Sequence, residues 1–590
     1  MGYTGKNNAR EILLKGLGRL EYRGYDSAGV ALAGESGIYI QKKKGRLKEL
    51  DAKEIPSTNI GIGHTRWATH GKPSNENSHP FSDCTGDIAI VHNGIIDNFI
   101  HLKEDLINKG HEFTSETDSE IISHLLEEHF NGDLVDTLKI VVKMLKGSFA
   151  ICALQKDSKN IAVARNQSPL VIGLGVGENF VASDVPAILD YTNEVKYLED
   201  GDVALLTPNE VRIWDSQDAL VERDVVEIQW TIEDAEKGGY EHYMLKEIHE
   251  QPKAIHASLL GRLGGFTEVD LGKYDTEFIR LISCGTSYHA ALVGKYLIED
   301  IARIPCTAEL ASEYRYSSPS ELHPFTILIS QSGETADTIA AAKEAKRRGC
   351  KTLAVTNVMN SSITREVDEV IFTHAGPEIG VAATKTFTTQ VIMMYLIAIE
   401  LGLKTKRLLR ETAQEYRDEL RRIPRHVRVL LDRSEDIERV SEKLIGADDI
   451  FFVGRHLNYP VALEGALKLK EIAYIHSAGY PAGELKHGPF ALLTNRTPVV
   501  AISVKDHTFE KMLGNIGEIA SRDSPIIAVG DHDPELEKLS DDLITVPSVP
   551  TLFSPILVNV VLQLLAYYTA YKLECAIDKP RNLAKSVTVE

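Results

Sequence analysis

The sequence has 590 residues, of which 43% are hydrophobic and 25% charged, as in ordinary globular enzymes. A chain of this length exceeds what one hydrophobic core supports, so we expect two to four domains. Its formal net charge of -20 disfavours nucleic acid and membrane surfaces as partners, because both would repel an acidic protein.

The cysteines are scattered along the chain, at Cys84, Cys152, Cys284, Cys306, Cys350 and Cys575. Their spacing includes no CxxC pair, which favours reduced thiols in a cytoplasmic protein over disulfides or a zinc site. We also expect no membrane segment, because no stretch approaches the roughly 18 apolar residues that a spanning helix needs.

The first part of the chain, up to about residue 225, is predicted to contain short strands interrupted by two helices. The helices are expected over 9–20 and 119–128, and the strands over 61–64, 87–92, 148–154, 160–165 and 203–207. Strands that cluster in this way indicate an α+β domain with antiparallel sheets. The charged segment 224–251 marks its boundary.

The second part, from about residue 275, changes to strand–turn–helix units, the pattern of a doubly wound parallel α/β sheet. Strands are expected over 280–283, 326–330, 352–356 and 369–373, and again over 449–453, 498–503, 525–529 and 543–547. The helix-rich stretch 400–443 joins the two sets. Because the same order returns about 170 residues later, we predict an internal duplication.

Two turns of the first set have the composition of an anion site. The segments 284–287 (CGTS) and 330–335 (SQSGET) each leave a strand and enter a helix. A helix start offers unpaired N–H groups and a positive dipole end, and hydroxyls add donors for a phosphomonoester. Ordinary capping by Ser and Thr would explain either turn alone. Two such turns in one repeat predict a phosphate site.

The second set instead carries titratable side chains. Glu464, Lys468 and Glu471 are spaced i, i+4, i+7 and share one face of a predicted helix. An exposed ladder of charges would give the same spacing. Here the loop 483–489, rich in acid–base groups, follows closely. We therefore expect this region to take part in chemistry.

The C-terminal segment 578–590 (DKPRNLAKSVTVE) is too polar for a core helix, and it contains an amine, Lys585, that could reach a carbonyl substrate. Together with CGTS, SQSGET, EGALKLKE (464–471) and GELKHGP (483–489), it resembles the family of glutamine–fructose-6-phosphate aminotransferases (isomerizing), which form glucosamine 6-phosphate. The resemblance runs from Met1 to Glu590.

The resemblance implies two sugar-isomerase (SIS) subdomains that bind fructose 6-phosphate. It implies that Lys585 forms a Schiff base with the ketose and that Glu471 moves a proton between C1 and C2, assisted by Glu464 and Lys468. His487 of a neighbouring subunit would open the sugar ring, which implies a homodimer. The residues implied for sugar-phosphate binding are Thr286, Ser287, Ser330, Gln331, Ser332, Thr335, Val381 and Ala584. Such a route needs an amine and a base, so we expect neither metal nor cofactor.

The first part resembles a class II glutamine amidotransferase of the N-terminal-nucleophile type. The matching segments are 19–27, 63–71 (GHTRWATHG), 91–95 (VHNGI) and 115–118 (SETD). Taken singly, Arg66-Trp67 could be a surface cation–π pair and His92-Asn93-Gly94 an Asn-Gly turn. Four segments in the family's order favour the glutaminase. The implied glutamine-binding residues are Arg66, Thr69, His70 and Asp118; the implied oxyanion hole is Asn93 with the Gly94 N–H, and the implied ammonia gate is Trp67.

The start of the sequence departs from the family. Its members begin Met-Cys-Gly-Ile-Val-Gly-Tyr, and the cysteine attacks glutamine after the methionine is removed. This sequence begins Met1-Gly2-Tyr3, without the Cys-Gly-Ile-Val piece, and the nearest cysteine along the chain, Cys84, belongs to a different loop. A misplaced start or trimmed sequence is the preferred explanation. The alternative is a real loss, leaving an ammonia-dependent synthase or a sugar-phosphate isomerase.

These inferences predict an N-terminal-nucleophile-type glutaminase sandwich followed by two SIS-type doubly wound subdomains. The expected boundaries are 1–225 for the amidotransferase, 226–274 for a linker with a connecting helix, 275–410 and 411–577 for the SIS subdomains, and 578–590 for the active-site tail. Two alternative functions remain. One is an SIS enzyme that acts on another amino sugar phosphate, which would not need a glutaminase domain. The other is an inactive sugar-phosphate-binding regulator, which would not need Lys585 and Glu471.

Overall fold

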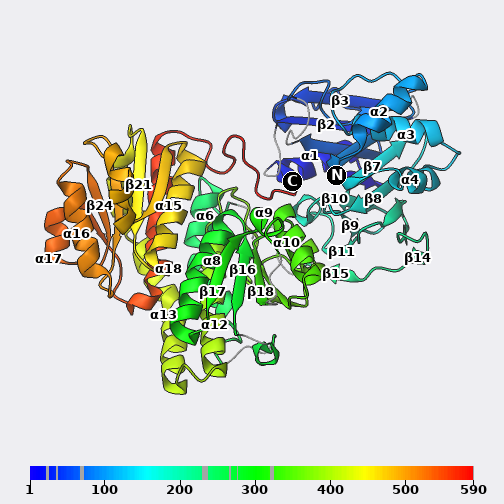
Figure 1. Cartoon of the computed structure of the whole chain (residues 1–590). Helices are drawn as coiled ribbons and strands as arrows, with labels where there is room; N and C mark the ends of the chain where they lie inside the picture. The colour runs from blue at the N-terminus through cyan, green and yellow to red at the C-terminus, as the bar shows by residue number, and fades with distance from the viewer. Residues whose placement is uncertain are drawn as a thin grey trace. The chain divides into compact units, whose positions relative to one another are not determined.

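The chain folds into two compact units in the computed structural model (Figure 1). One contains Met1–Ala235 with Ser586–Glu590, and the other contains Glu236–Lys585. The structure describes residues 1–21, 26–34, 37–66, 72–228, 237–264, 268–274, 277–318 and 324–588. Each unit is described by itself below.

The N-terminal unit contains two sheets of antiparallel strand pairs. The order of the first is β15-β11-β9-β10-β1-β4-β2-β3, and that of the second is β14-β13-β12-β8-β7-β6-β5. The first comprises β1 (Gly2–Thr4), β2 (Ser27–Gly34), β3 (Gly37–Lys44), β4 (Ile60–Arg66), β9 (Val171–Leu174), β10 (Asn179–Ala182), β11 (Glu194–Tyr197) and β15 (Val225–Glu227). The second comprises β5 (Phe81–Ser82), β6 (Ile88–Ile96), β7 (Gly147–Gln155), β8 (Ile161–Asn166), β12 (Val203–Leu206), β13 (Val211–Trp214) and β14 (Leu220–Val221).

Three apolar layers hold this unit together. Alternate residues of both sheets, such as Ile62 and Val163, form a core between the sheets. Helix α1 (Ala9–Leu20) packs on the first sheet through Leu13 and Leu17. Helices α2 (Phe99–Asn108), α3 (Glu120–His129) and α4 (Leu134–Val142) pack on the second. The predicted α+β sandwich is confirmed, because each sheet buries one face on the other and one face under helices.

The second unit contains two parallel sheets with one strand order, β17-β16-β18-β19-β20 and β22-β21-β23-β24-β25. The first comprises β16 (Ile279–Ser283), β17 (Cys306–Leu310), β18 (Phe325–Ser330), β19 (Thr352–Thr356) and β20 (Glu369–Phe372). The second comprises β21 (Asp449–Gly454), β22 (His476–Pro481), β23 (Val499–Ser503), β24 (Ile526–Gly530) and β25 (Asp542–Thr545). The predicted duplication is thereby confirmed. The edge strands β17 and β22 were not predicted because each has a single fully buried position and reads as a polar loop.

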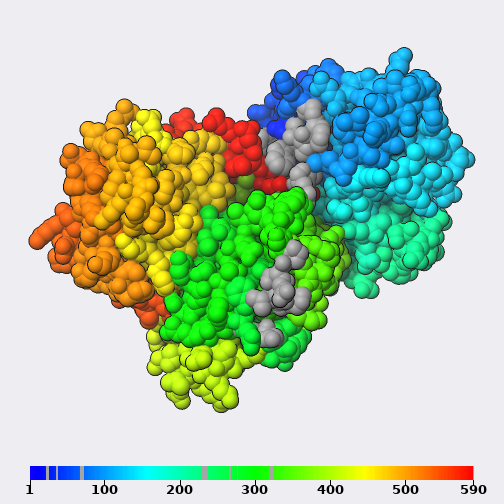
Figure 2. Space-filling view, viewed as in Figure 1, coloured from blue at the N-terminus to red at the C-terminus, as the bar shows by residue number. Residues whose placement is uncertain are grey.

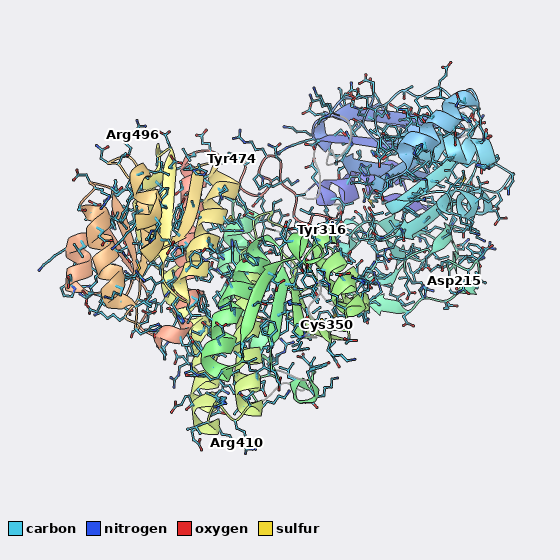
Figure 3. The ribbon with its side chains drawn as sticks, viewed as in Figure 1. Asp215, Tyr316, Cys350, Arg410, Tyr474 and Arg496 are labelled. Atoms are coloured by element: carbon cyan, nitrogen blue, oxygen red, sulfur yellow. The ribbon has the colours of Figure 1, made fainter. Side chains whose placement is uncertain are left out.

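Helices cover both sheets of this unit (Figure 1). They are α6 (Tyr243–His249), α7 (Gln251–Leu259), α8 (Gly285–Leu297), α9 (Ala311–Tyr314), α10 (Ala336–Arg347), α11 (Ser362–Glu366), α12 (Lys385–Lys404), α13 (Arg410–Leu431), α14 (Ser434–Ser441), α15 (Asn458–Ala473), α16 (Phe509–Ala520), α17 (Pro534–Leu539) and α18 (Ser554–Lys572). One core contains residues of both repeats, including Leu281 and Ile327 of the first and Val500 of the second. The charged helix α13, which begins at the Arg410 labelled in Figure 3, lies at the surface in Figure 2.

The expectation that no segment is apolar enough to span a bilayer was wrong as stated. Helix α12 and the segment Thr551–Lys572 are long and apolar enough by length and composition. However, 89% of the apolar 18-residue window in α12 and 83% of the window in Thr551–Lys572 are buried inside the protein. Their hydrophobicity is that of core helices, which are apolar all round because neighbouring elements surround them.

The packing of α15 on α18 gives a test of this core. A Cβ added at Gly465 of α15 would lie 2.6 Å from Leu562 Cδ1 and 3.0 Å from the Phe452 ring. Gly465→Ala should therefore destabilise the unit by about 1–3 kcal/mol through overpacking. In the matched control Gly514→Ala, a helical site with open space around it, stability should rise by about 0.5–1 kcal/mol. Urea unfolding of both variants measures this, and equal effects would contradict the packing.

Candidate active site

The hydroxyl-rich turns of the first repeat meet at one point of the fold. Strands β16 and β18 are parallel neighbours, and Ser283 lies opposite Ile329 at their carboxyl ends. The next strand in the chain, β17, lies on one side of β16, and the following strand, β18, lies on the other. The order in which the chain adds strands to the sheet therefore reverses at β16, and ligands bind at such points in this class of fold. The segments 284–287 and 330–335 leave these two strand ends.

The second turn is held by its own hydroxyls. Ser330 Oγ accepts the Gly333 N–H at 3.1 Å, and Ser332 Oγ accepts the Glu334 N–H at 3.1 Å. Gly333 has φ +67°, and a Cβ there would lie 2.0 Å from Ser361 Oγ, so glycine is required. The capping considered as an alternative is thus real, and it leaves each hydroxyl hydrogen available to a ligand.

A buried cluster joins the first turn to α15 of the second repeat. Thr286 Oγ1 donates to Glu464 Oε1 at 3.0 Å and accepts from Lys468 Nζ at 3.0 Å. Nζ also lies 3.3 Å from Glu464 and 2.7 Å from Glu471 Oε2. His289 of α8 contacts Glu464 Oε2 through Nδ1 at 2.7 Å. The helical spacing predicted from the sequence therefore forms a buried cluster and not an exposed ladder.

The electrostatics of this cluster distinguish its two carboxyls. Burial raises the pKa of Glu464, but the Lys468 ammonium and His289 outweigh it and lower the pKa below its ordinary value. For Glu471, burial dominates, and the pKa stays raised despite Lys468. A carboxyl with a raised pKa exchanges protons more readily near neutral pH. Glu471 is accordingly the carboxyl suited to proton transfer, and Glu464 the one suited to hold a charge.

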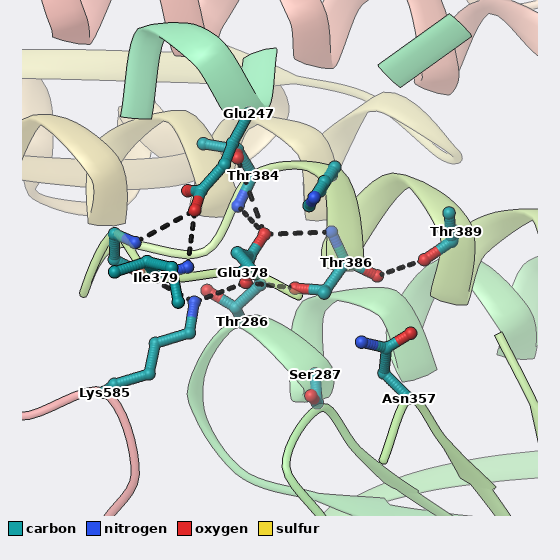
Figure 4. Close-up of polar contacts among 12 residues, drawn as sticks. Glu247, Thr286, Ser287, Asn357, Glu378, Ile379, Thr384, Thr386, Thr389 and Lys585 are labelled. Atoms are coloured by element: carbon teal, nitrogen blue, oxygen red, sulfur yellow. Dashed lines mark hydrogen bonds and ion pairs between the residues drawn. The ribbon is translucent and has the colours of Figure 1, made fainter. Parts of the chain in front are cut away.

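Lys585 lies in the same unit, and its ammonium is buried (Figure 4). Nζ donates to Glu378 Oε2 and to the Gly380 carbonyl, the latter at 2.8 Å. Glu378 also accepts the Thr384 N–H at 2.9 Å and the Thr386 hydroxyl at 2.6 Å. Burial raises the pKa of Glu378, but Lys585 and these donors outweigh it and lower the pKa to about 2. The Lys585 charge also lowers the pKa of Glu471, although burial keeps that pKa raised overall.

The tail that carries Lys585 is anchored at two points within its unit. Asp578 accepts the N–H groups of Tyr243 and Met244, both at 3.0 Å, at the start of α6. Farther along, the Arg581 N–H donates to the Tyr474 hydroxyl at 2.8 Å, and its guanidinium lies 4.3 Å from the centre of the Tyr474 ring (labelled in Figure 3). These contacts fix the path of the tail on both sides of residues 579–580.

The remaining residues predicted for the sugar site have varied surroundings. Ser287 Oγ accepts from Gln390 Nε2 at 3.0 Å. The Gln331 carbonyl accepts the Asn357 N–H at 3.1 Å. The Val381 N–H donates to the Asp578 carbonyl at 3.2 Å. Thr335 precedes α10, with Oγ1 3.4 Å from Ser330 Oγ, and Ala584 is half-buried. His487 is exposed in the 3-10 turn Ala482–His487, and no hydrogen bond or ion pair among the described residues links it to Lys585 or Glu471.

Two buried carboxyls near Lys585 were not predicted from the sequence. Glu378 follows β20, in the glycine-flanked loop 376–380, and Glu247 belongs to α6. Glu247 Oε1 accepts the N–H groups of Ile379 and Gly380, at 2.5 and 3.1 Å. Burial, followed by the Glu378 charge, raises the pKa of Glu247 to about 7. In the sequence, Glu378 could have been noticed as an acidic residue between two glycines after a strand. No such pattern marks Glu247.

The N-terminal unit has a pocket of its own. It is lined by Met1, Leu17, Leu20, His64, Thr65, Arg66, His79, His92, Asn93, Gly94, Asp118, Ser119, Pro169, Ser183, Ser586 and Thr588. Burial lowers the pKa of His64 to about 3. Its ring is therefore neutral, and Nε2, 2.7 Å from Asn93 Oδ1, can only donate to that acceptor. This contact leaves the Asn93 NH₂ group to face a ligand, as an oxyanion donor must.

Several of the other predicted glutamine-site residues lie in the part of the chain that the structure describes. Arg66, at the end of β4, is buried, and the Asp118 charge raises its pKa against the larger lowering effect of burial. Asp118 Oδ2 accepts the Ile96 N–H at 2.9 Å. Gly94 has φ +131°, and a Cβ there would lie 2.0 Å from the Ser148 carbonyl oxygen. Trp67, Thr69 and His70 lie outside the described residues.

The cysteine nearest the start of the chain in space is Cys152, not Cys84. The Met1 amine is buried and donates to the Gly63 carbonyl at 2.8 Å. A Cβ added at Gly2 would lie 2.9 Å from Cys152 Sγ. Burial raises the pKa of Cys152 to about 12, so its thiol stays protonated and is a poor nucleophile.

The folds and the two sites define a class of protein: an amidotransferase domain joined to a duplicated sugar-isomerase domain. The model of the glutamine amidotransferase domain matches residues 64–190, and the model of the SIS domain matches residues 274–400 and 443–573. The C-terminal domain of a glucosamine-fructose-6-phosphate aminotransferase from Francisella tularensis is 36% identical, with a TM-score of 0.54 over 58% of this chain and 99% of that one.

Full-length relatives specify the family. The glutamine–fructose-6-phosphate aminotransferases (isomerizing) of Caldanaerobacter subterraneus and Methanosarcina mazei are each 49% identical, and that of Thermus thermophilus is 48% identical. Each comparison covers 100% of this chain and 99% of the relative. The chain belongs to the glutamine–fructose-6-phosphate aminotransferase (isomerizing) family, as its sequence motifs predicted.

The raised pKa of Glu247 gives a pH test. Between the ordinary value of 4.5 and about 7, the folded protein binds a proton that the unfolded chain does not, so stability should fall as pH rises through this range. Glu247→Gln, which keeps the shape without the charge, should flatten this slope. Melting temperatures between about pH 5 and 8 measure it. The exposed control Glu510→Gln should keep the wild-type slope; an unchanged slope in Glu247→Gln would contradict the assignment.

Proposed function

We propose that this chain converts D-fructose 6-phosphate and L-glutamine to D-glucosamine 6-phosphate and L-glutamate, the first step of amino sugar synthesis. The observation that carries the proposal is the buried Lys585 amine, in one unit with the hydroxyl turns and a carboxyl of raised pKa. Family membership over the whole chain supports the same reaction. An amine, a base and an anion cradle are what a ketose-to-amino-aldose conversion needs.

The phosphate would bind first, at the turns 284–287 and 330–335. Thr286, Ser287, Ser330, Ser332 and Thr335 offer hydroxyls there, and the backbone N–H groups at the starts of α8 and α10 add their dipole. Gln331, Val381 and Ala584 would complete the contacts to the sugar. Because the phosphate is fixed at one end, the carbonyl carbon at the other end is presented to the amine in a restricted geometry.

Lys585 would then form the imine. The ammonium has to leave Glu378 and lose its proton before it can attack C2, and water leaves as the imine forms. Ammonia adds to the imine carbon, and Lys585 is released when the C2–lysine bond breaks. Glu471 removes a C1 proton and returns it to C2 as the 1-hydroxyl proton passes to the C2 nitrogen, which leaves an aldehyde at C1 and an amine at C2. Lys468 and Glu464 hold the cluster in place. His487 would open the ring; because it is exposed, we infer that it serves a neighbouring subunit in a homodimer.

Glutamine would supply the ammonia from the N-terminal pocket. Arg66 would bind the carboxylate of glutamine and Asp118 its amino group, with Thr69 and His70 in the same site. Asn93 and the Gly94 N–H would stabilise the oxyanion, and Trp67 would gate ammonia. These substrates are small and soluble, so we infer a cytoplasmic enzyme without nucleic-acid or membrane partners.

Lys585→Arg separates the charge of this residue from its chemistry. Arginine keeps a cation opposite Glu378 but cannot form an imine, so synthesis should fall by at least about a thousandfold while the protein stays folded. Formation of glucosamine 6-phosphate from fructose 6-phosphate and ammonium measures this step without the glutaminase. The control Lys572→Arg, a residue paired with Glu438 and Glu442 at the surface, should keep normal activity. Near-normal turnover in Lys585→Arg would refute the Schiff base.

The nitrogen source can be tested with the polypeptide as printed, its N-terminus verified by mass spectrometry. The glutamine-dependent reaction proposed above needs the family's N-terminal cysteine, so a polypeptide that starts as printed should use ammonium but not glutamine. Inserting Cys-Gly-Ile-Val between Met1 and Gly2 should give glutamine-dependent synthesis once the methionine is removed. Cys152→Ser should change neither activity, because its thiol is protonated. Glutamine use by the printed polypeptide that Cys152→Ser abolishes would instead identify Cys152 as a substitute nucleophile.

A further inference from the structure

Four metal-ligating side chains converge in the N-terminal unit, away from the residues that line its pocket. They are Cys84, in the turn between β5 and β6, His111, which follows α2, and His124 and Glu127 of α3. Their ligand atoms all lie within 4.8 Å of one another. His124 and Glu127 share a helix face at i, i+3, whereas the other two are brought in by the fold, which is why the spacing of the sequence predicted no metal site.

The distances between these atoms match a tetrahedral shell. Cys84 Sγ lies 3.7 Å from His111 Nδ1 and 3.5 Å from His124 Nδ1. Glu127 Oε2 lies 3.1 Å from His111 Nδ1 and 3.5 Å from His124 Nδ1. A zinc ion with bonds of about 2.3 Å to sulfur and about 2.0–2.1 Å to nitrogen and oxygen separates its ligands by about 3.3–3.6 Å. These four of the six distances between ligand atoms are therefore close to those around one ion, and all six are within 4.8 Å.

The far nitrogens of both imidazoles face carboxylates. His111 Nε2 lies 3.3 Å from Glu128 Oε2, and His124 Nε2 lies 3.9 Å from Glu120 Oε1. In metal sites a carboxylate at the far nitrogen keeps the proton there and turns the other nitrogen's lone pair to the metal. Glu127 Oε2 lies 3.1 and 3.5 Å from the two Nδ1 atoms and also accepts the Cys84 N–H at 3.0 Å. A cation bound here would use the lone pairs of both Nδ1 atoms and of this oxygen.

We propose that Cys84, His111, His124 and Glu127 bind one zinc ion in a structural site. A thiolate, two neutral imidazoles and a carboxylate balance the charge of a divalent ion, and this mixed set of soft and borderline ligands suits zinc better than calcium or magnesium. Four protein ligands leave no open position for a substrate, so the ion has no catalytic role. The exposed side of Cys84 provides the path by which the metal enters.

The ion connects three segments that are otherwise distant in sequence. It holds the turn after β5 and the segment after α2 against α3, which begins two residues after Asp118 in the chain. Asp118 and Ser119 line the glutamine pocket. Loss of the metal would therefore loosen the helix start that positions them. The expected phenotype is weaker glutamine binding with ammonia-dependent synthesis unchanged.

The first test is the metal content of the full-length protein, expressed without a metal-binding tag in zinc-supplemented medium and desalted without chelator. Elemental analysis should find about one zinc ion per chain. Cys84→Ser and His124→Asn should each lower zinc affinity by at least about tenfold in a competition titration with a chromogenic chelator. The control Cys575→Ser, a cysteine of the other unit, should retain the metal. Wild-type protein that takes up no zinc, or variants that all bind as wild type does, would overturn the proposal.

A second measurement does not depend on the variants folding. Wild-type protein stripped of metal and titrated with Co²⁺ should develop the intense visible bands of tetrahedral cobalt and a thiolate-to-cobalt charge-transfer band, both saturating at one equivalent. If Cys84→Ser folds, it should keep visible bands and lose the charge-transfer band. Weak octahedral bands alone, or a charge-transfer band that survives in Cys84→Ser, would show that these side chains are not the ligands.

Discussion

The buried cluster at the proposed sugar site depends on one positive charge, the Lys468 ammonium. An ammonium without partners in the protein interior would cost several kcal/mol, and removing one partner of such a cluster typically costs about 3–5 kcal/mol. Thr286, Glu464 and Glu471 meet this requirement at 3.0, 3.3 and 2.7 Å. The two carboxyls belong to the same helix as Lys468, whereas the Thr286 hydroxyl comes from the first repeat, so the hydrogen bonds of the ammonium are complete only when both repeats are folded against each other.

The same constraint recurs at Lys585. Its ammonium lies opposite Glu378, whose carboxylate also takes hydrogen bonds from Thr384 and Thr386. A carboxylate with this many donors stays ionised and is a weak base. It therefore holds the lysine in a resting position without competing for its proton. Glu471, whose pKa burial raises, is left as the group that can exchange protons.

Sequence patterns predicted most of the fold and the position of part of the candidate site. Buried strands and the helix 9–20 have strong periodicity, so their positions were correct within a few residues, whereas edge strands such as β22 bury too little to leave a signal. Glu464, Lys468 and Glu471 were found because helical spacing places them on one face. Glu378 and the cluster around Cys84 were missed because tertiary packing alone assembles them. For the same reason, spacing gave no information about where His487 acts.

The two parallel sheets have identical strand order, yet only the first has a cluster of hydroxyls at the point where the strand order reverses. In the second, the Arg455 guanidinium occupies the equivalent turn and bonds Asn515 Oδ1 at 2.7 Å, while α15 contributes acid–base groups to the first repeat. The two copies are therefore not interchangeable: the hydroxyl turns belong to one and the buried acid–base cluster to the other. Neither copy, separated from its neighbour, would retain a complete candidate site.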